Sequence, residues 1–235
     1  GSATHFALAA SFFTEVGVVA VVGNDFPQAY LQFFADHKID TTGLAFKDGK
    51  TFRWRGYYEY DLNQAHTLET QLNVFENFQP VLPEAYKAVD YLFLANIDPV
   101  LQLNVLKQVK EPKLVVSDTM NFWIDLKPDE LKKVISGVDF CFMNESEARQ
   151  FCQTYSLLNS ARKLLAYGPK AVILKKGEHG ALLFTDNTHF SAPAFPLEEI
   201  KDPTGAGDSF AGGFIGWLAK TNDLTEANIR KAIVY

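Results

Sequence analysis

Short apolar runs alternate with segments of helical periodicity along most of this 235-residue chain. The runs predict strands at Val16–Val22, Tyr91–Asn96, Lys113–Asp118, Val138–Met143, Lys170–Lys175 and Ala181–Thr185. The periodic segments predict helices at Pro27–His37, Pro99–Val109, Pro128–Ile135, Ser146–Phe151, Ser156–Ala166, Ala206–Lys220 and Leu224–Tyr235. Strands that alternate with helices favour an α/β fold whose mostly parallel sheet is covered on both faces.

The segment Gly43–Asn73 interrupts this alternation. It is aromatic and rich in turn residues, and its polar and apolar positions alternate in part, which predicts a small β appendage on the sheet. Arg53 and Arg55 flank Trp54, so we expect both arginines to project from one face of a strand. A plain surface hairpin is the alternative interpretation of this segment.

The composition agrees with a large α/β core, because 47% of the residues are hydrophobic and 20 are Phe. The formal net charge of −6 argues against a general nucleic-acid surface. No apolar stretch of the sequence reaches the length of a membrane span. Cys141 and Cys152 lie in apolar surroundings, which predicts buried thiols in a reducing cytoplasm. We therefore expect a cytoplasmic protein that binds neither nucleic acid nor membrane.

The most informative motif runs from Asp202 through Pro-Thr-Gly-Ala-Gly to Asp208 and opens the predicted helix Ala206–Lys220. A helix N-terminus offers free N–H groups and a partial positive charge. Gly205 and Gly207 let an anion approach those groups closely. Asp208 would then lie beside the anion, where a carboxylate can take the proton of an attacking hydroxyl. The alternative is a tight loop that leads into a buried helix without any chemistry.

Two other phosphate-binding motifs fit this chain poorly. The dinucleotide fingerprint needs a buried strand before it and a third Gly or Ala, but Phe210 stands there and the preceding residues do not form a convincing strand. The Walker A loop needs four residues between its glycines, whereas five separate Gly43 from Gly49. We exclude a Walker A loop and favour an anion site over a dinucleotide site.

Three of the predicted strands end in a polar residue, at Asn96, Asp118 and Asn144. Ligands of open parallel sheets bind at the carboxyl ends of the strands. We therefore expect a cleft along this edge of the sheet. Each of the three residues could instead be an ordinary turn residue that ends a strand.

The motif from Asp202 to Asp208 resembles the signature of the ribokinase-like carbohydrate kinases, the PfkB family, and the resemblance extends over essentially the whole chain. It implies a three-layer α/β/α sandwich with a mostly parallel sheet and a small β lid over the sugar site. We expect residues 1–42 and 74–235 to form the kinase core, truncated at both ends, and residues 43–73 to form the lid. Gly1-Ser2 is either native or the remnant of a tag.

The resemblance also assigns roles to residues of the phosphoryl-transfer site. Asp208 would be the catalytic base, and the backbone N–H groups of Gly205, Ala206 and Gly207 would stabilise the transferring group. Asn144 and Glu147 match an Asn-x-x-Glu motif that organises Mg²⁺ and phosphates, largely through water. Such an arrangement suits Mg²⁺, which keeps several waters.

Other positions are assigned to the ligand sites in the same way. Lys175, Gly177 and Gly180 resemble a nucleotide-contacting turn in which Lys175 replaces the usual hydroxyl residue. Such a lysine could reach a phosphate, and a solvated surface lysine is the alternative. Asp202 would help a monovalent cation such as K⁺ to shape the anion loop, the run from Asp202 to Gly207 at the start of the predicted helix. The expected contacts to the sugar come from Gly1, Ser2 and His5, with His5 where Asn is common, together with Asn96.

The resemblance implies an ATP-dependent kinase that transfers the γ-phosphoryl group to an alcohol of a sugar or sugar-like small molecule, with Mg²⁺. A homodimer formed through the lid is a further expectation. One alternative is a nucleoside kinase of the adenosine type, although His66-Thr67-Leu68 stands where that branch often has Arg-Ser-Leu. The other alternative is a non-catalytic sugar- or nucleotide-binding protein of the same fold.

Overall fold

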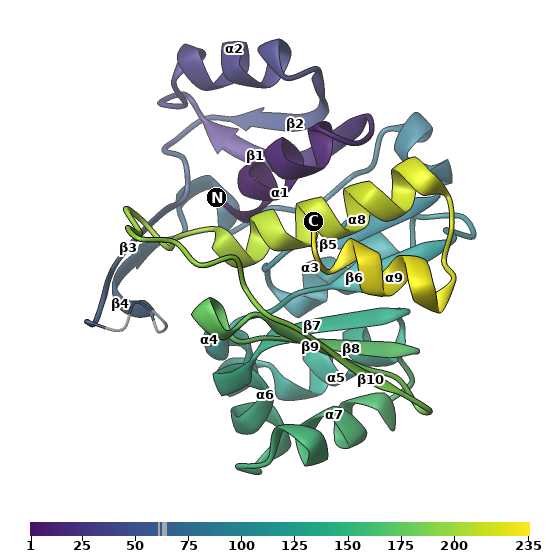
Figure 1. Ribbon diagram of the computed structural model, residues 1–235. Coiled ribbons are helices and arrows are strands. Elements are labelled where there is room, and N and C mark those ends of the chain that lie inside the picture. The colour runs from purple at the N-terminus through teal and green to yellow at the C-terminus, as the bar shows by residue number, and fades with distance from the viewer. Residues whose placement is uncertain (61, 63–64) are drawn as a thin grey trace.

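The computed structural model describes residues 1–60, 62 and 65–235 and is built around a six-stranded sheet (Figure 1). The strand order is β10-β9-β8-β7-β6-β5. The strands are β5 (Tyr91–Leu94), β6 (Leu114–Ser117), β7 (Phe140–Asn144), β8 (Ala171–Lys175), β9 (Ala181–Phe184) and β10 (His189–Ala192). Neighbours from β5 to β8 are parallel, whereas β9 and β10 are antiparallel to their neighbours.

Helices cover both faces of this sheet because its central strands are apolar on both sides. On one face, Phe140 and Phe142 of β7 pack against Phe214 of α8. On the other, Cys141 and Met143 pack among the remaining helices. The first face is covered by α1 (Ser2–Ser11), α8 (Ala206–Thr221) and α9 (Glu226–Ala232). The second is covered by α3 (Pro99–Leu106), α4 (Asn121–Leu126), α5 (Pro128–Ser136), α6 (Glu145–Cys152) and α7 (Leu157–Leu165). The predicted three-layer sandwich is confirmed.

Strands β1 (Val16–Gly23) and β2 (Ile39–Lys47) form a second, parallel two-stranded sheet, against which α2 (Gln28–Asp36) packs. The predicted lid therefore begins too early, since residues 43–47 belong to β2. Gly43 allows the close pairing, because a Cβ there would lie only 2.6 Å from the carbonyl oxygen of Val18. This contact depends on a neighbouring strand, and the local sequence does not show it.

The hairpin of β3 (Arg53–Tyr58) and β4 (Ala65–Gln71) projects from the body beside the N-terminus and the loop before α8 (Figure 1). At its base, an Asp25 carboxylate oxygen accepts hydrogen bonds from the Thr51 N–H at 2.6 Å and the Thr51 hydroxyl at 2.7 Å. These bonds attach the hairpin to the end of β1. Three positions of the predicted lid, Asp61, Asn63 and Gln64, lie outside the described residues.

All of the predicted strands and helices are present, with ends that differ by a few residues. Helix α4, strand β10 and the extent of β2 were not predicted. Three short 3₁₀ helices complete the described elements, η1 (Asn73–Phe75), η2 (Glu84–Ala88) and η3 (Gly177–His179). None of the helices in the described part of the chain has both the length and the apolar character needed to cross a membrane.

Candidate active site

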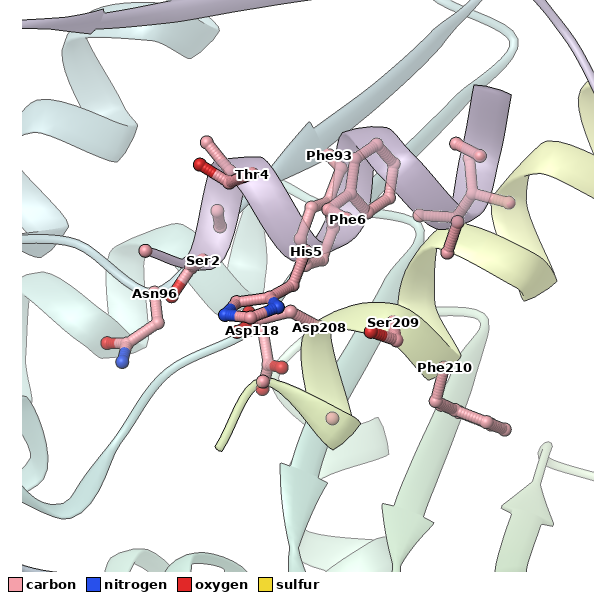
Figure 2. Close-up of a pocket in the computed structure, with 18 of the residues that line it drawn as sticks. Ser2, Thr4, His5, Phe6, Phe93, Asn96, Asp118, Asp208, Ser209 and Phe210 are labelled. Atoms are coloured by element: carbon pink, nitrogen blue, oxygen red, sulfur yellow. The ribbon is translucent and has the colours of Figure 1, made fainter. Parts of the chain in front are cut away.

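A cleft of about 2640 Å³ includes the carboxyl ends of the parallel strands. Asn96, Asp118, Asn144 and Lys175 line it from the ends of β5, β6, β7 and β8. Asn144 and Lys175 are direct neighbours in the sheet register. This is the cleft that the polar strand ends predict. Figure 2 shows part of it, where α1 and the start of α8 approach the loops after β5 and β6.

The loop that leads into α8 is a tight turn with Gly205 at its centre. Gly205 has φ +81°, in the left-handed region that glycine tolerates best. A Cβ at this position would also meet the His5 ring at 2.4 Å. Upstream, the Asp202 carboxylate accepts a hydrogen bond from the Thr204 N–H at 2.8 Å. The Thr204 side chain, followed by this backbone bond, lowers the pKa of Asp202. The structure thus places His5 directly against the anion loop.

The first turn of α8 leaves only some of its N–H groups available to an anion. The Ala206 N–H donates to the Pro203 carbonyl at 3.1 Å, and the Ser209 N–H donates to the Gly205 carbonyl at 2.8 Å. The sequence assigned the Ala206 N–H to the anion, but the turn already uses it. The N–H groups of Gly205 and Gly207 remain candidates from the predicted set, because no described backbone group accepts from them.

Asp208 lies in the first turn of α8, facing the cleft near Ser2 and Asp118 (Figure 2). Burial raises the pKa of Asp208 to about 6, and the Asp118 carboxylate adds to this rise. Lys175 and the Ser2 hydroxyl oppose it. Burial also lowers the pKa of His5, which favours a neutral imidazole. Asp208 is therefore a partly desolvated carboxylate whose proton affinity suits a general base near neutral pH.

Asn144 and Glu147 hold each other in a capping box at the start of α6. The Asn144 side chain accepts from the Glu147 N–H at 2.8 Å, and Glu147 Oε2 accepts from the Asn144 N–H at 2.7 Å. Glu147 is buried, with 8% exposure, and burial raises its pKa. Oε1 of Glu147 is left for a ligand or a water.

This donor set fits Mg²⁺ held mainly by water and phosphate oxygens. No group of three or more His, Cys, Asp or Glu side chains in the described residues could enclose a metal ion. Glu147 offers one carboxylate oxygen, and Mg²⁺ is often bound by one or two carboxylates with several waters and substrate phosphates. A bound cation would also favour the ionised form of this buried acid.

Lys175 is buried at the end of β8 and is not the solvated surface lysine considered from the sequence. Its Nζ lies 2.5 Å from Oδ2 of Asp118, and the two side chains are 17% and 4% exposed. The other Asp118 carboxylate oxygen accepts from the Thr119 N–H at 3.0 Å. The sequence placed Asp118 in the cleft without a role. Its partner is 57 positions away, so no local spacing could reveal the pair.

Gly177 and Gly180 shape the turn between β8 and β9. Both have positive φ, +53° and +85°. A Cβ at Gly180 would lie 2.0 Å from the carbonyl oxygen of Ala192, and the Gly180 carbonyl accepts from the Lys176 N–H at 2.8 Å. The glycines are thus explained by backbone geometry, while their contact with a nucleotide stays a prediction.

The acceptor side of the cleft contains polar atoms without a protein partner. Among the described residues, Asn96 Oδ1 and Thr119 Oγ1 are buried and make no hydrogen bond. Both residues line the cleft, as do Gly1 and Ser2. Buried polar atoms of this kind normally find a partner in water or a ligand. Their position suits a ligand that carries hydroxyl groups.

The inner face of the hairpin completes the cleft. Trp54 and Tyr58 both line it, and the Tyr58 hydroxyl lies 3.2 Å from the Thr204 hydroxyl of the anion loop. Trp54 Nε1 donates to the Thr67 hydroxyl at 3.0 Å. Arg53 and Arg55 are exposed on the opposite face, as their alternation with Trp54 predicts. Tyr57 also faces outward, where it stacks on His66.

An α/β sandwich with a buried carboxylate at a glycine-lined helix N-terminus defines a class of phosphotransferases that act on hydroxyl groups. The chain belongs to the pfkB family of carbohydrate kinases, whose family model matches residues 1–230. It is therefore an ATP-dependent kinase of sugar-like substrates, as the motif from Asp202 to Asp208 predicts.

Relatives and solved structures agree with this membership. The chain is 32% identical to a cytidine kinase from Thermococcus kodakarensis over 231 residues, which are 96% of this chain and 81% of that protein. A putative ribokinase II from E. coli, solved with ATP and Mg²⁺, superimposes with a TM-score of 0.79 at 19% identity, covering 99% of this chain and 79% of that one. A fructokinase double mutant from Vibrio cholerae, with bound fructose, ADP and potassium ion, superimposes with a TM-score of 0.78 at 19% identity. The superposition covers 99% of this chain and 80% of that one.

Proposed function

We propose that Asp208 is the general base of this kinase and that the acceptor hydroxyl binds between α1 and the first turn of α8. The observation that supports this proposal most directly is the position of Asp208. It is a desolvated carboxylate at the N-terminus of α8, beside the proposed anion site. The acceptor oxygen forms a bond to the γ-phosphorus of ATP while the bond to the β,γ-bridging oxygen breaks. The hydroxyl proton passes to Asp208, and the electron pair of the broken bond leaves with ADP.

The anion loop stabilises the transferring phosphoryl group in this proposal. The N–H groups of Gly205 and Gly207, which have no backbone acceptor among the described residues, lie at the positive end of the α8 dipole and would bind the oxygens of that group. Ser2, His5 and Asn96 orient the acceptor from the opposite side, where Asn96 Oδ1 can accept a substrate hydroxyl. The neutral His5 adds no charge beside Asp208.

The nucleotide site in this proposal lies along the ends of β7 and β8. Lys175, Gly177 and Gly180 line it, and Asn144 and Glu147 hold Mg²⁺ through water. The ion neutralises charge on the β- and γ-phosphates when it is bound. Asp202, at the start of the same loop, would contribute to a K⁺ site.

We extend the proposal to the surroundings of the site. The outward face of the hairpin, with Arg53, Arg55 and Tyr57, forms the contact of a homodimer. Sedimentation of the wild type and of an Arg53→Glu/Arg55→Glu variant tests this contact, since only the wild type should sediment as a dimer.

Cys141 and Cys152 are free and buried, which agrees with a reducing cytoplasm.

A nucleoside acceptor is a second candidate, and two observations favour it. The relative with 32% identity over 96% of this chain is a cytidine kinase. The inner face of the hairpin also offers Trp54, whose indole lies over Gly56, since a Cβ there would meet the ring at 2.3 Å. A flat indole at the cleft suits stacking on a base, and it suits the apolar face of a sugar as well.

An acceptor panel tests the function and separates the two candidates. ADP formation is measured with ATP, Mg²⁺ and either ribose, deoxyribose, fructose, cytidine or adenosine, and products are identified by mass spectrometry. We expect acceptor-dependent ADP formation with a phosphorylated product. A preference for cytidine or adenosine over all free sugars selects the nucleoside kinase. ATP binding without transfer to any acceptor would contradict the proposed function and favour a binding protein.

A further inference from the structure

Lys175 and Asp118 form a buried ion pair that packing alone does not explain. The Nζ–Oδ2 distance is 2.5 Å, and both side chains are largely removed from water. Taking two charges out of water costs free energy that their attraction need not repay, so a buried pair is weak evidence for a stabilising role. The strand ends that carry the pair meet in the cleft.

The ammonium group lies directly beneath the anion loop. A Cβ built on Gly207 would be 2.9 Å from Lys175 Nζ, so the lysine reaches the first turn of α8. Of its three N–H donors, one goes to Asp118, and no other group in the described residues accepts from the remaining two. An anion held by the Gly207 N–H would therefore meet this ammonium group as well.

The carboxylates around Lys175 make a positive charge at this point necessary for binding an anion. Asp118, Glu147 and Asp208 all act on Lys175, and together they hold its pKa above the ordinary value although burial alone would lower it. Three carboxylates facing a polyphosphate would repel it. Lys175 supplies a fixed positive charge at this point that a hydroxyl residue could not supply, and it does so without reorganisation during the reaction.

We propose that Lys175 is a catalytic residue that binds an oxygen of the transferring phosphoryl group, and that Asp118 is the positioning residue that holds the ammonium there. This inference rests on the proposed kinase reaction. Lys175 neither gains nor loses a proton in the step, and its charge offsets the negative charge that develops on the phosphoryl oxygens. Asp118 fixes one N–H of Lys175 so that the other two point toward the anion loop, and its carboxylate also contributes to the raised pKa of Asp208.

The test compares Lys175→Met, Asp118→Asn, the double variant and Lys170→Met. Lys170 is the matched control, because it immediately precedes β8, is exposed outside the cleft, and its loss changes the net charge equally. Single-turnover transfer is measured with an acceptor that the wild type phosphorylates, and ATP affinity is measured by calorimetry. If the wild type phosphorylates no acceptor, the proposed function itself has failed, which is a separate result.

We expect Lys175→Met to slow transfer by about 10²–10³-fold, with a much smaller change in ATP affinity, as for loss of one preorganised donor. Lys170→Met should transfer at the wild-type rate. Adding Asp118→Asn to Lys175→Met should slow transfer no further. In the double variant neither charge is left without its partner, so this variant tests the proposal if Lys175→Met does not fold. The proposal would be overturned if the double variant transferred at the rate of the control. It would also be overturned if the rate losses of the two single variants multiplied in the double variant.

Discussion

At the scale of single residues, Asp208 should reduce the stability of the fold that contains it. Its pKa rises from 3.8 to about 6 on folding, chiefly through burial. The folded protein therefore holds this proton more tightly than the unfolded chain does. As the pH rises from about 4 to about 6, the unfolded chain loses the proton first, and the carboxylate lowers the stability of the fold.

We predict that Asp208→Asn stabilises the protein at neutral pH. A shift of about two pKa units corresponds to at most about 3 kcal/mol in the free energy of unfolding. Urea unfolding of both proteins between pH 4 and pH 8 measures the difference, which should grow with pH up to about 6 and then stay constant. The same stability for the two proteins at pH 8 would show that Asp208 is not desolvated.

Gly207 is the second residue whose replacement has a distinct outcome. In Gly207→Val the new side chain meets the Lys175 ammonium, since its Cβ would lie 2.9 Å from Nζ, and it covers the adjacent N–H. We expect turnover to fall by about 10²–10³-fold while the protein still folds. Steady-state kinetics and circular dichroism measure the two properties.

Gly137→Val, at the end of α5, is the matched control for this substitution. There an added Cβ has ordinary contacts of 3.4 Å or more, and the position is outside the cleft. Turnover should stay near the wild-type value in the control. Normal turnover in a folded Gly207→Val variant would remove Gly207 from the anion site.

Local sequence could predict the parts of the site that lie within one motif. Asp208, Gly205 and Gly207 belong to a single run, and Asn144 and Glu147 are three positions apart. The ion pair of Asp118 and Lys175 joins two strand ends that only the folded sheet brings together, so no local spacing indicates it. The Ala206 N–H, which the motif also assigns to the anion, donates to the Pro203 carbonyl in a turn that only the backbone geometry shows.

At the scale of elements, the hairpin β3–β4 contrasts with the rest of the fold. Its base is attached to the body through Asp25 and Thr51, and Tyr58 contacts Thr204 of the anion loop. Strands β7 and β8, in contrast, are buried along most of their length. An element with few buried contacts can open at a low free-energy cost, which suits a lid that covers the acceptor site and excludes water.

We predict that hydrogen exchange will show the hairpin to be a mobile lid. Amide protection in residues 53–58 and 65–71 should rise when an acceptor and a non-hydrolysable ATP analogue bind together. Protection in β7 and β8 should be high without ligand and should change little, which provides the internal control. A hairpin that is as protected as β7 before binding, and unchanged after it, would instead be a fixed structural element.

The elements that the sequence missed share a physical cause. Helix α4 has six residues, too few to show a period, and ends immediately before the Lys127-Pro128 start of α5. Strand β10 has four residues and is only partly buried, so its apolar pattern is weak. Strand β2 contains Thr41, Thr42 and Gly43, and its pairing with β1 depends on contacts across the sheet. The more apolar strands, including the four-residue β6 and β9, and the longer helices carried clear patterns and were predicted.

At the scale of the whole molecule, the fold gathers charges that are distant in the sequence. The ends of β6 and β8 and the starts of α6 and α8 place Asp118, Lys175, Glu147 and Asp208 around one cleft. Helix α1 closes it with Ser2 and His5, which lie near Asp118 and Asp208 (Figure 2). The cluster has more acidic than basic groups, so it can receive a polyphosphate only with added positive charge from Mg²⁺ and the helix terminus. The fold thus brings the proposed proton acceptor and the proposed anion site together.

The most direct test of the central claim is phosphoryl transfer by Asp208→Asn as a function of pH. The variant should bind ATP like the wild type but transfer about 10²–10⁴-fold more slowly, because the amide cannot accept the proton. In the wild type, kcat/KM should fall as the pH drops below about 6, where Asp208 becomes protonated. Turnover by the variant above roughly a third of the wild-type rate, with chemistry limiting in both, would contradict the role of Asp208 as the base, since its loss should cost at least about 10²-fold.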